Sequence, residues 1–122
     1  LMAPAYAASA MLADTQLALQ DFDYYELHEA FAAQVLCTLK AWESPDFCRE
    51  RLGRSAALGR IDPARINVKG GSVALGHPFA ATGGRILAAL AKLLANDARA
   101  TRGLVSVCTA GGMGVTAIVE RA

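Results

Sequence analysis

The chain has 122 residues, enough for one domain with a core of ordinary size, and 54% of them are hydrophobic. Twelve basic residues balance eleven acidic ones, so the net charge of +1 excludes the strongly basic surface typical of nucleic-acid or polybasic membrane binding. No apolar run approaches the roughly 18 residues that span a bilayer. The three cysteines lack CxxC spacing and a neighbouring His-x-x-x-His, which favours a reducing, cytoplasmic setting over a disulfide framework or a structural metal site.

Helix and strand signals alternate along the first third of the chain. Pro4 and the alanine-rich run after it predict a helix that fades near Asp14. The aromatic content of "DFDYYELHE" predicts a strand at residues 23–27. The next helix ends at Ser44-Pro45, and its apolar stripe has spacings of four, four and three: Phe31, Val35, Leu39 and Trp42.

The middle of the chain is its most polar part. We interpret residues 46–65 as a solvated segment with a short helix. After it, "INVKGGSVAL" predicts a short strand at residues 66–68, which the glycines then end.

The last third contains the most apolar elements. Residues 86–95 predict a helix that we expect to be largely buried, because alanine fills the sides that its leucines leave free. Two β-branched runs, "GLVSVCT" and "GVTAIVER", flank "AGGMG" and predict a hairpin. The order α-β-α-(β)-α-β-β predicts an α/β domain with helices layered on a mixed sheet.

The glycine-rich loop before residue 86 does not match a phosphate-binding motif. "GSVALGHP" has the GxxxxG spacing, but His77-Pro78 stands where a Lys-Ser/Thr pair would hold phosphate and magnesium. No GxGxxG follows a predicted strand either, so nucleotide binding through these loops is disfavoured.

A thiol and two imidazoles occupy places where α/β folds gather reactive groups. Cys108 ends a predicted strand before a glycine turn, whose N–H groups can converge on an anion and lower a thiol pKa. We place His77 and His28 at the ends of two other predicted strands, and this trio suits proton transfer and stabilisation of a carbonyl oxygen. From the pattern alone, a small core residue for Cys108 and a structural donor for His77 are the more frequent roles.

Three motifs, in this order, resemble the C-terminal half of a thiolase. They are "HEAFAAQ" at 28–34, "NVKGGSVALGHPFAATGGR" at 67–85 and "CTAGGMGVTAIVE" at 108–120. The resemblance covers nearly the whole chain and is closest to the fatty-acid-oxidation type, as in the β subunit of the trifunctional complex. It implies a layered α/β fold and an acyltransferase that cleaves a 3-ketoacyl-CoA with CoA, giving acetyl-CoA and a shortened acyl-CoA, or runs the reverse condensation.

The resemblance also implies roles for single residues. Cys108 matches the acid/base cysteine, which moves protons to and from the substrate α-carbon and the incoming thiol. His77 matches the histidine that activates the nucleophilic cysteine and donates to the thioester oxygen. His28 stands where most thiolases have asparagine beside the water of an oxyanion site, so its N–H would bond that water or replace it.

Four further residues are expected around the substrate. Ala110 replaces a usual glycine and offers its backbone N–H as an oxyanion contact, while Gly111 shapes the turn after the cysteine. Phe79 is expected to line the acyl-pantetheine pocket, and Phe31 either lines that pocket or packs in the core.

The family's nucleophilic cysteine and CoA-binding loop belong to the N-terminal half, and no residue here matches them. Cys37 and Cys48 lack the surroundings that make a thiolate reactive. We therefore expect residues 1–122 to be the C-terminal domain of a longer chain, inactive alone and lacking the first strand of its half. The expected protein partners are that N-terminal half, a second copy of the chain, which the free sheet edge favours, and a β-oxidation α subunit. Acyl-CoA and CoA are expected as substrates, with no other cofactor.

Two other functions share some of these sequence features. A ketoacyl-synthase-like condensing enzyme shares the fold and a Gly-His loop, but it would have an Asn-Ser-Phe-Gly-type turn where this chain has "CTAGG", so Cys108 argues against it. A thiolase-like subunit that binds lipid or a partner without catalysis is disfavoured by the intact "GHP" and "CTAGG", and the absent half leaves it open.

Overall fold

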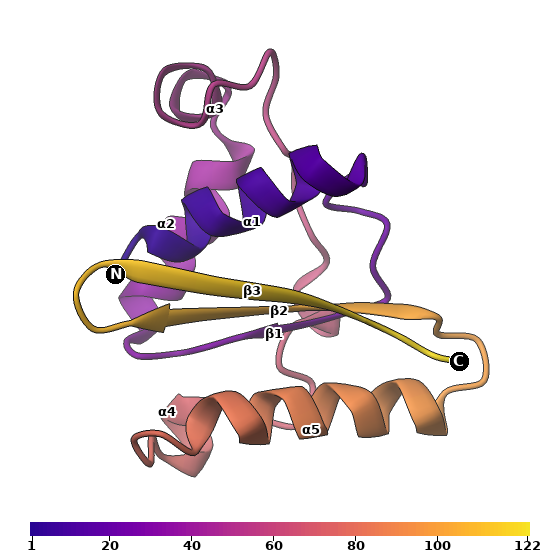
Figure 1. Cartoon of the computed structure of the whole chain (residues 1–122). Coiled ribbons are helices and arrows are strands. Elements are labelled where there is room, and N and C mark those ends of the chain that lie inside the picture. The colour runs from indigo at the N-terminus through magenta and orange to yellow at the C-terminus, as the bar shows by residue number, and fades with distance from the viewer.

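A three-stranded sheet separates two layers of helices in the computed structural model of residues 1–122 (Figure 1). β1 (Tyr24–Leu27) runs parallel to the central strand β2 (Arg102–Thr109), and β3 (Met113–Glu120) runs antiparallel to β2. The predicted mixed sheet is confirmed. Because β1 and β2 are parallel, they end at the same edge of the sheet, and His28 is brought beside the end of β2.

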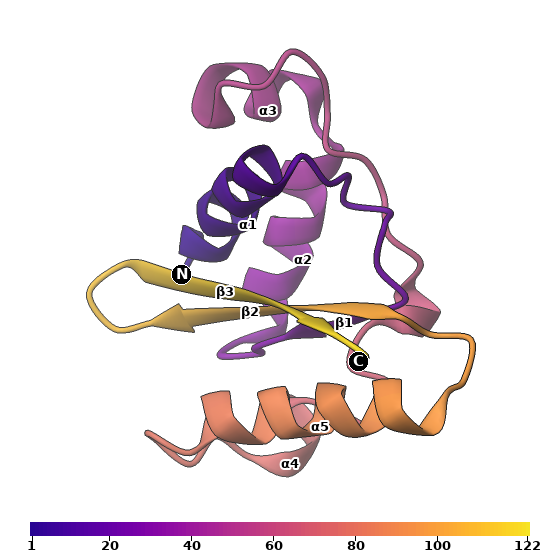
Figure 2. The ribbon, with the colours of Figure 1, turned by 45° about the vertical axis from the view of Figure 1, so that its right-hand side comes forward.

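Five α-helices and one 3₁₀ turn make up the other elements. In chain order they are α1 (Ala3–Thr15), α2 (Ala32–Glu43), α3 (Pro45–Leu52), η1 (Pro63–Arg65), α4 (Ser72–Leu75) and α5 (Thr82–Asn96). The first three lie on one side of the sheet, and α4 and α5 lie on the other (Figure 2). The predicted first helix, first strand and second helix are all present, and α3 is the short helix expected in the polar segment.

The larger core lies between the sheet and the pair α1 and α2. Trp42 is fully buried at the end of α2, and its indole N–H donates to the Ala5 carbonyl oxygen of α1 at 3.3 Å. Ala5 and Ala8 are themselves fully buried, and their small side chains allow α1 to lie close to the sheet. Of the predicted stripe on α2, Phe31 is the exception, because it precedes the helix as its N-cap and is 63% exposed.

The second core lies under α5. Ile86, Leu90 and Leu94 are buried there against Val105 of β2. The expectation that this helix is largely buried is wrong, because only one side of it contacts the sheet. The opposite side, which includes Leu87 at 45% exposure, is open in this chain.

The predicted strand at residues 66–68 is also absent. Ile66 forms a single parallel bridge with Tyr25, and the backbone then turns at Asn67, whose φ is +47°. The Asn67 side chain accounts for the difference: its Oδ1 accepts from the Leu27 N–H at 2.8 Å, and its Nδ2 donates to the Leu27 carbonyl at 2.9 Å. One amide group thus makes the two hydrogen bonds that a continued strand would have made.

Two local predictions from the sequence are confirmed. Ser44 separates α2 from α3, and its hydroxyl caps α3 by accepting from the Phe47 N–H at 3.1 Å. The hairpin of β2 and β3 closes through three residues, of which Gly111 and Gly112 have φ of +82° and +77°. Such positive φ values favour glycine. No helix in the structure has both the length and the apolar character that crossing a bilayer requires.

Replacing Trp42 by alanine should lower the free energy of unfolding by about 3 to 5 kcal/mol, because it empties the largest buried site of the core and removes the bond to α1. Leu36→Ala on the same helix is the matched control, since Leu36 is 62% exposed and should change stability by about 0.5 kcal/mol or less. Urea unfolding followed by circular dichroism measures both. Equal losses in the two variants would contradict the packing described here.

Candidate active site

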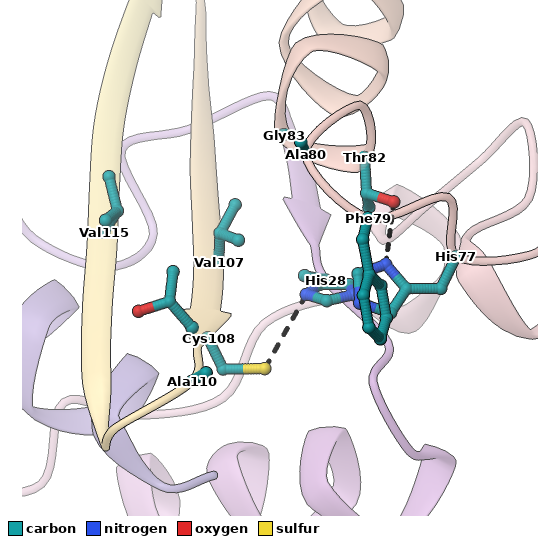
Figure 3. Close-up of a pocket in the computed structure, with 11 residues that line it drawn as sticks. His28, His77, Phe79, Ala80, Thr82, Gly83, Val107, Cys108, Ala110 and Val115 are labelled. Atoms are coloured by element: carbon teal, nitrogen blue, oxygen red, sulfur yellow. Dashed lines mark hydrogen bonds between the residues drawn. The ribbon is translucent and has the colours of Figure 1, made fainter.

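A cavity of about 430 Å³ opens between the start of α5 and the place where β2 ends and β3 begins (Figure 3). His28, His77 and Cys108 lie along it together with apolar side chains. Three groups from distant parts of the sequence, all singled out beforehand, therefore meet at one cavity.

His28 is fixed at the edge of the sheet by its backbone. Its N–H donates to the Ser106 carbonyl at 2.8 Å, which extends the parallel pairing of β1 and β2 by one residue. The side chain is only 2% exposed, and Nδ1 lies 3.6 Å from the Sγ of Cys108. Thiol and imidazole are thus close enough to exchange a proton without a bridging water.

Cys108 is buried on β2, at 7% exposure. Besides His28, its Sγ faces the Oε1 of Gln34 on α2, at 4.0 Å. Gln34 is the last residue of the motif "HEAFAAQ", but the motif alone does not indicate its contact with the thiol.

His77 stands beside His28, with 4.4 Å between the ring centroids, and is itself exposed. Its Nδ1 lies 2.8 Å from the Thr82 hydroxyl oxygen, and that hydroxyl donates its one proton to the Pro78 carbonyl at 3.0 Å. With its proton used in this way, the hydroxyl oxygen can accept from Nδ1–H of His77. In the neutral imidazole, Nε2 then carries the free lone pair.

The placement of His77 at a strand end is wrong. It follows α4 and Gly76, because the chain turns at Asn67 and forms one turn of helix instead of a strand. Ala80, three residues further on, also lines the cavity and has a φ of +65°, a conformation that costs a non-glycine residue about 1 to 2 kcal/mol.

Burial and charge both act on His28. Burial lowers its pKa, and the neighbouring His77 lowers it further, so the His28 imidazole is neutral near pH 7. Its Nε2 is buried without any hydrogen-bond partner in the protein. An unpartnered buried nitrogen is costly and suits a ring that binds an oxygen atom from outside the chain.

Glu26 is a second unusual group near the end of β1. It is 3% exposed, and burial raises the pKa of its carboxyl from an ordinary value of 4.5 to about 7, with the nearby Glu29 adding to the rise and Arg85 opposing it. Sequence analysis did not single out Glu26, because a buried carboxylic acid has no local sequence signature.

The other residues expected at the site are distributed unevenly. Ala110 and Phe79 line the cavity, the latter with 84% of its surface exposed. Gly111 belongs to the turn after Cys108 but does not line the cavity. Phe31 neither lines the cavity nor packs in the core, contrary to both expectations, because it caps α2 on the surface.

The remaining cysteines lie outside the cavity. Cys37 is exposed on α2. Cys48 is fully buried on α3, and its Sγ donates to the carbonyl oxygens of Ala41 and Trp42, both at 3.5 Å. The polar segment 46–65 thus contributes a small side chain to the core.

Taken together, the fold and the cavity define a layered α/β domain with a thiol–imidazole site suited to acid–base chemistry on a carbonyl compound. Residues 1–121 match the family described as "Thiolase, C-terminal domain". The chain belongs to the thiolase family.

Relatives and solved structures agree with this assignment. The chain is 47% identical over 120 residues to a 3-ketoacyl-CoA thiolase of Pectobacterium atrosepticum and 46% identical to one of Shewanella baltica, covering 98% of this chain and 27% of each relative. It is similar in structure to an acetyl-CoA acetyltransferase from Syntrophomonas wolfei, with a TM-score of 0.76, 32% identity, and coverage of 96% of this chain and 26% of the other. The chain is also similar to the peroxisomal 3-ketoacyl-CoA thiolase of Saccharomyces cerevisiae, which is described as five-layered and built from two core domains of identical topology. Here the TM-score is 0.74 and the identity is 36%, with coverage of 98% of this chain and 29% of the yeast chain. The chain thus spans about a quarter of the length of the relatives it matches.

The buried Glu26 predicts a pH dependence of stability. Because its pKa is raised in the folded state, the folded chain keeps a proton that the unfolded chain loses between pH 4.5 and about 7, so stability falls as pH rises through that window. Between pH 5 and pH 8 the wild type should lose about 2 to 3 kcal/mol more than Glu26→Gln, whose side chain does not ionise. Urea unfolding of both proteins at the two pH values measures the difference, and parallel curves would contradict the assignment.

Proposed function

We propose that this chain is a part of the C-terminal half of a thiolase, which cleaves a 3-ketoacyl-CoA with CoA to give acetyl-CoA and a shortened acyl-CoA, or runs the reverse condensation. The observation that carries the proposal is the meeting of Cys108, His28 and His77 at one cavity. The names of the relatives, 3-ketoacyl-CoA thiolase and acetyl-CoA acetyltransferase, support the same reaction class. The nucleophilic cysteine would come from the N-terminal half, so the isolated chain would be inactive.

Cys108 would act as the acid and base of the reaction. In cleavage its thiol first gives a proton to the α-carbon of the leaving acetyl group, and the thiolate then takes the proton of the incoming CoA thiol; in condensation the transfers reverse. The neutral imidazole of His28, 3.6 Å from the Sγ, supports this role because it can share the thiol proton. Gln34 offers a further acceptor at the sulfur.

His77 would activate the missing nucleophile. Thr82 holds its Nδ1–H, so Nε2 is free to take the proton of a thiol brought against the exposed ring. Once protonated, the same nitrogen can donate to the thioester oxygen of the substrate.

His28 would contribute to the oxyanion site with the nitrogen that lacks a partner. When Nδ1 takes the thiol proton, or a share of it, Nε2–H is left as a donor toward a substrate oxygen or its bound water. Asparagine, which most thiolases have here, offers a donor but no proton-accepting nitrogen, so His28 would link the oxyanion site to the acid/base cysteine.

The apolar side of the cavity would receive the acyl-pantetheine part of the substrate. Phe79 of the loop before α5, Val107 of β2 and Val115 of β3 contribute to this side, together with the Ala110 turn. CoA and acyl-CoA would serve as substrates, with no further cofactor.

The N-terminal half would cover the open side of α5. Gly83 and Gly84 stand in the first turns of this helix, where glycine costs about 1 kcal/mol relative to alanine, yet a Cβ at either position would meet nothing within 4 Å in this chain. Glycine is useful there if another backbone approaches closely. Leu87 on the same helix is exposed, and the yeast relative is built from two such domains.

Three finer assignments follow from the resemblance to the fatty-acid-oxidation type. We propose a homo-oligomer, since a yeast relative is described as dimeric, together with a cytoplasmic location and a β-oxidation α subunit as partner. Co-purification of the full-length protein tests the partner.

In the full-length protein, Cys108→Ser should lower kcat for thiolysis of a 3-ketoacyl-CoA by about 10²- to 10⁴-fold, because a hydroxyl exchanges protons far less readily than a thiol near pH 7. Cys37→Ser is the matched control, and its kcat should stay within about twofold of the wild type because Cys37 is exposed and lies outside the cavity. A steady-state assay with short and long substrates measures both. Near-normal turnover of folded Cys108→Ser would refute the acid/base role.

Leu87→Arg tests the docking of the N-terminal half. In the 122-residue chain the arginine reaches water, and the thermal midpoint should stay within about 2 °C of the wild type. In the full-length protein the same charge would be buried without a partner, and the midpoint should fall by about 6 °C or more. Equal shifts in the two proteins would argue against this interface.

A further inference from the structure

We propose that Glu29 is a positioning residue of the thiolase reaction, because its carboxylate joins the loop that carries His28 to the loop that carries His77. The inference rests on the proposed function and adds a residue to it. Glu29 directly follows His28 in the sequence, and its two oxygens contact two different parts of the second loop.

The carboxylate makes one contact on each side of the Gly70-Gly71 turn. Oε1 accepts from Nδ2 of Asn67 at 2.6 Å, before the turn, and Oε2 accepts from the Val73 N–H at 2.9 Å, after it. Both are hydrogen bonds to a carboxylate, which are stronger than bonds between neutral groups. Asn67 is itself bonded to Leu27 by its side chain, so the contacts connect the end of β1, the turn and α4.

Gly71 makes this approach sterically feasible. A Cβ built on Gly71 would lie 2.3 Å from the carboxyl carbon of Glu29 and 2.4 Å and 2.6 Å from its oxygens. At that distance even an alanine methyl group would displace the flexible end of Glu29, so the carboxylate keeps its observed position only while residue 71 is glycine. The buried turn is therefore shaped around the carboxylate of Glu29.

The segment from Ser72 to Gly76, which leads directly to His77, is held at both ends. Glu29 binds its start through the Val73 N–H. Arg85 of α5 binds both ends: Nη1 donates to the Gly76 carbonyl at 2.7 Å, and Nη2 donates to the hydroxyl of Ser72, at the start, at 3.0 Å. Glu29 and Arg85 thus set where His77 leaves the segment.

The relative placement of the two imidazoles depends on this connection. His28 is fixed to β2 through the Ser106 carbonyl, whereas the His77 ring is exposed and its hydrogen bond goes to Thr82 of α5, outside the sheet. Without Glu29 the loop keeps its Asn67 bonds to Leu27, but the residue next to His28 no longer holds the start of α4, and the segment that leads to His77 loses one of its fixed points. A displacement of about 1 Å between reacting groups can cost about 10²-fold in rate.

The test uses the full-length protein with two variants that disturb the same contact from opposite sides. Glu29→Gln keeps the size of the side chain but turns an amide NH₂ toward an N–H donor, and Gly71→Ala leaves the carboxylate intact but displaces it. Glu43→Gln on α2 is the matched control, because Glu43 is exposed and forms no ion pair.

We expect kcat for 3-ketoacyl-CoA thiolysis to fall about 10- to 100-fold in both variants, while KM stays within about threefold of the wild type. Because both substitutions disturb one contact, the variant that carries both should be no slower than the slower single variant. The burst of CoA released from an acyl-CoA when the nucleophile is acylated counts folded sites. It should keep its full amplitude in every variant and in Glu43→Gln, whose kcat should be normal.

Each result has a defined meaning. Wild-type kcat with a full burst in both variants would overturn the proposal. A burst amplitude that falls in proportion to kcat would also overturn it, since Glu29 would then stabilise the fold without positioning the imidazoles. If Glu29→Gln does not fold, Gly71→Ala decides by the same criteria. Absence of thiolysis in the wild type would instead refute the proposed function itself.

Discussion

The side-chain amide of Asn67 is the constraint on which the arrangement of the site depends. By bonding both backbone groups of Leu27, it fastens the loop to the end of β1 while its own backbone turns away from the sheet at a φ of +47°. On the other side, β1 is held by β2 through His28. The end of β1 that leads to His28 is therefore fixed from both sides. The chain after Asn67 returns to this end, where the His77 ring lies beside the His28 ring.

The two imidazoles lie in different surroundings and are therefore suited to different chemical roles. His28 is buried, neutral and close to a thiol, while His77 is exposed and oriented by Thr82. Burial at the end of β1 also raises the pKa of the Glu26 carboxyl from its ordinary value to about 7. Pairs of titratable groups with divergent environments are typical of sites that need both an acid and a base.

The sequence predicted the periodic elements and the hairpin, because apolar spacing, Pro4, Ser44 and the Gly111 turn act locally. It failed at residues 66–68, where a side chain replaces the backbone as partner of β1. It also failed on α5, since periodicity identifies an apolar side but not whether this chain covers it.

At the site, the motif resemblance singled out Cys108, His77 and His28, which lie at one cavity, whereas Phe31 is exposed and away from it. Glu29 and Gln34 were inside the same motifs, but their importance arises from contacts with residues far along the chain, which no local pattern encodes. The position of Trp42 has a practical consequence. Trp42 is the single tryptophan of the chain and is buried in the core between α1 and the sheet. Its fluorescence therefore reports on that core and does not originate in the cavity.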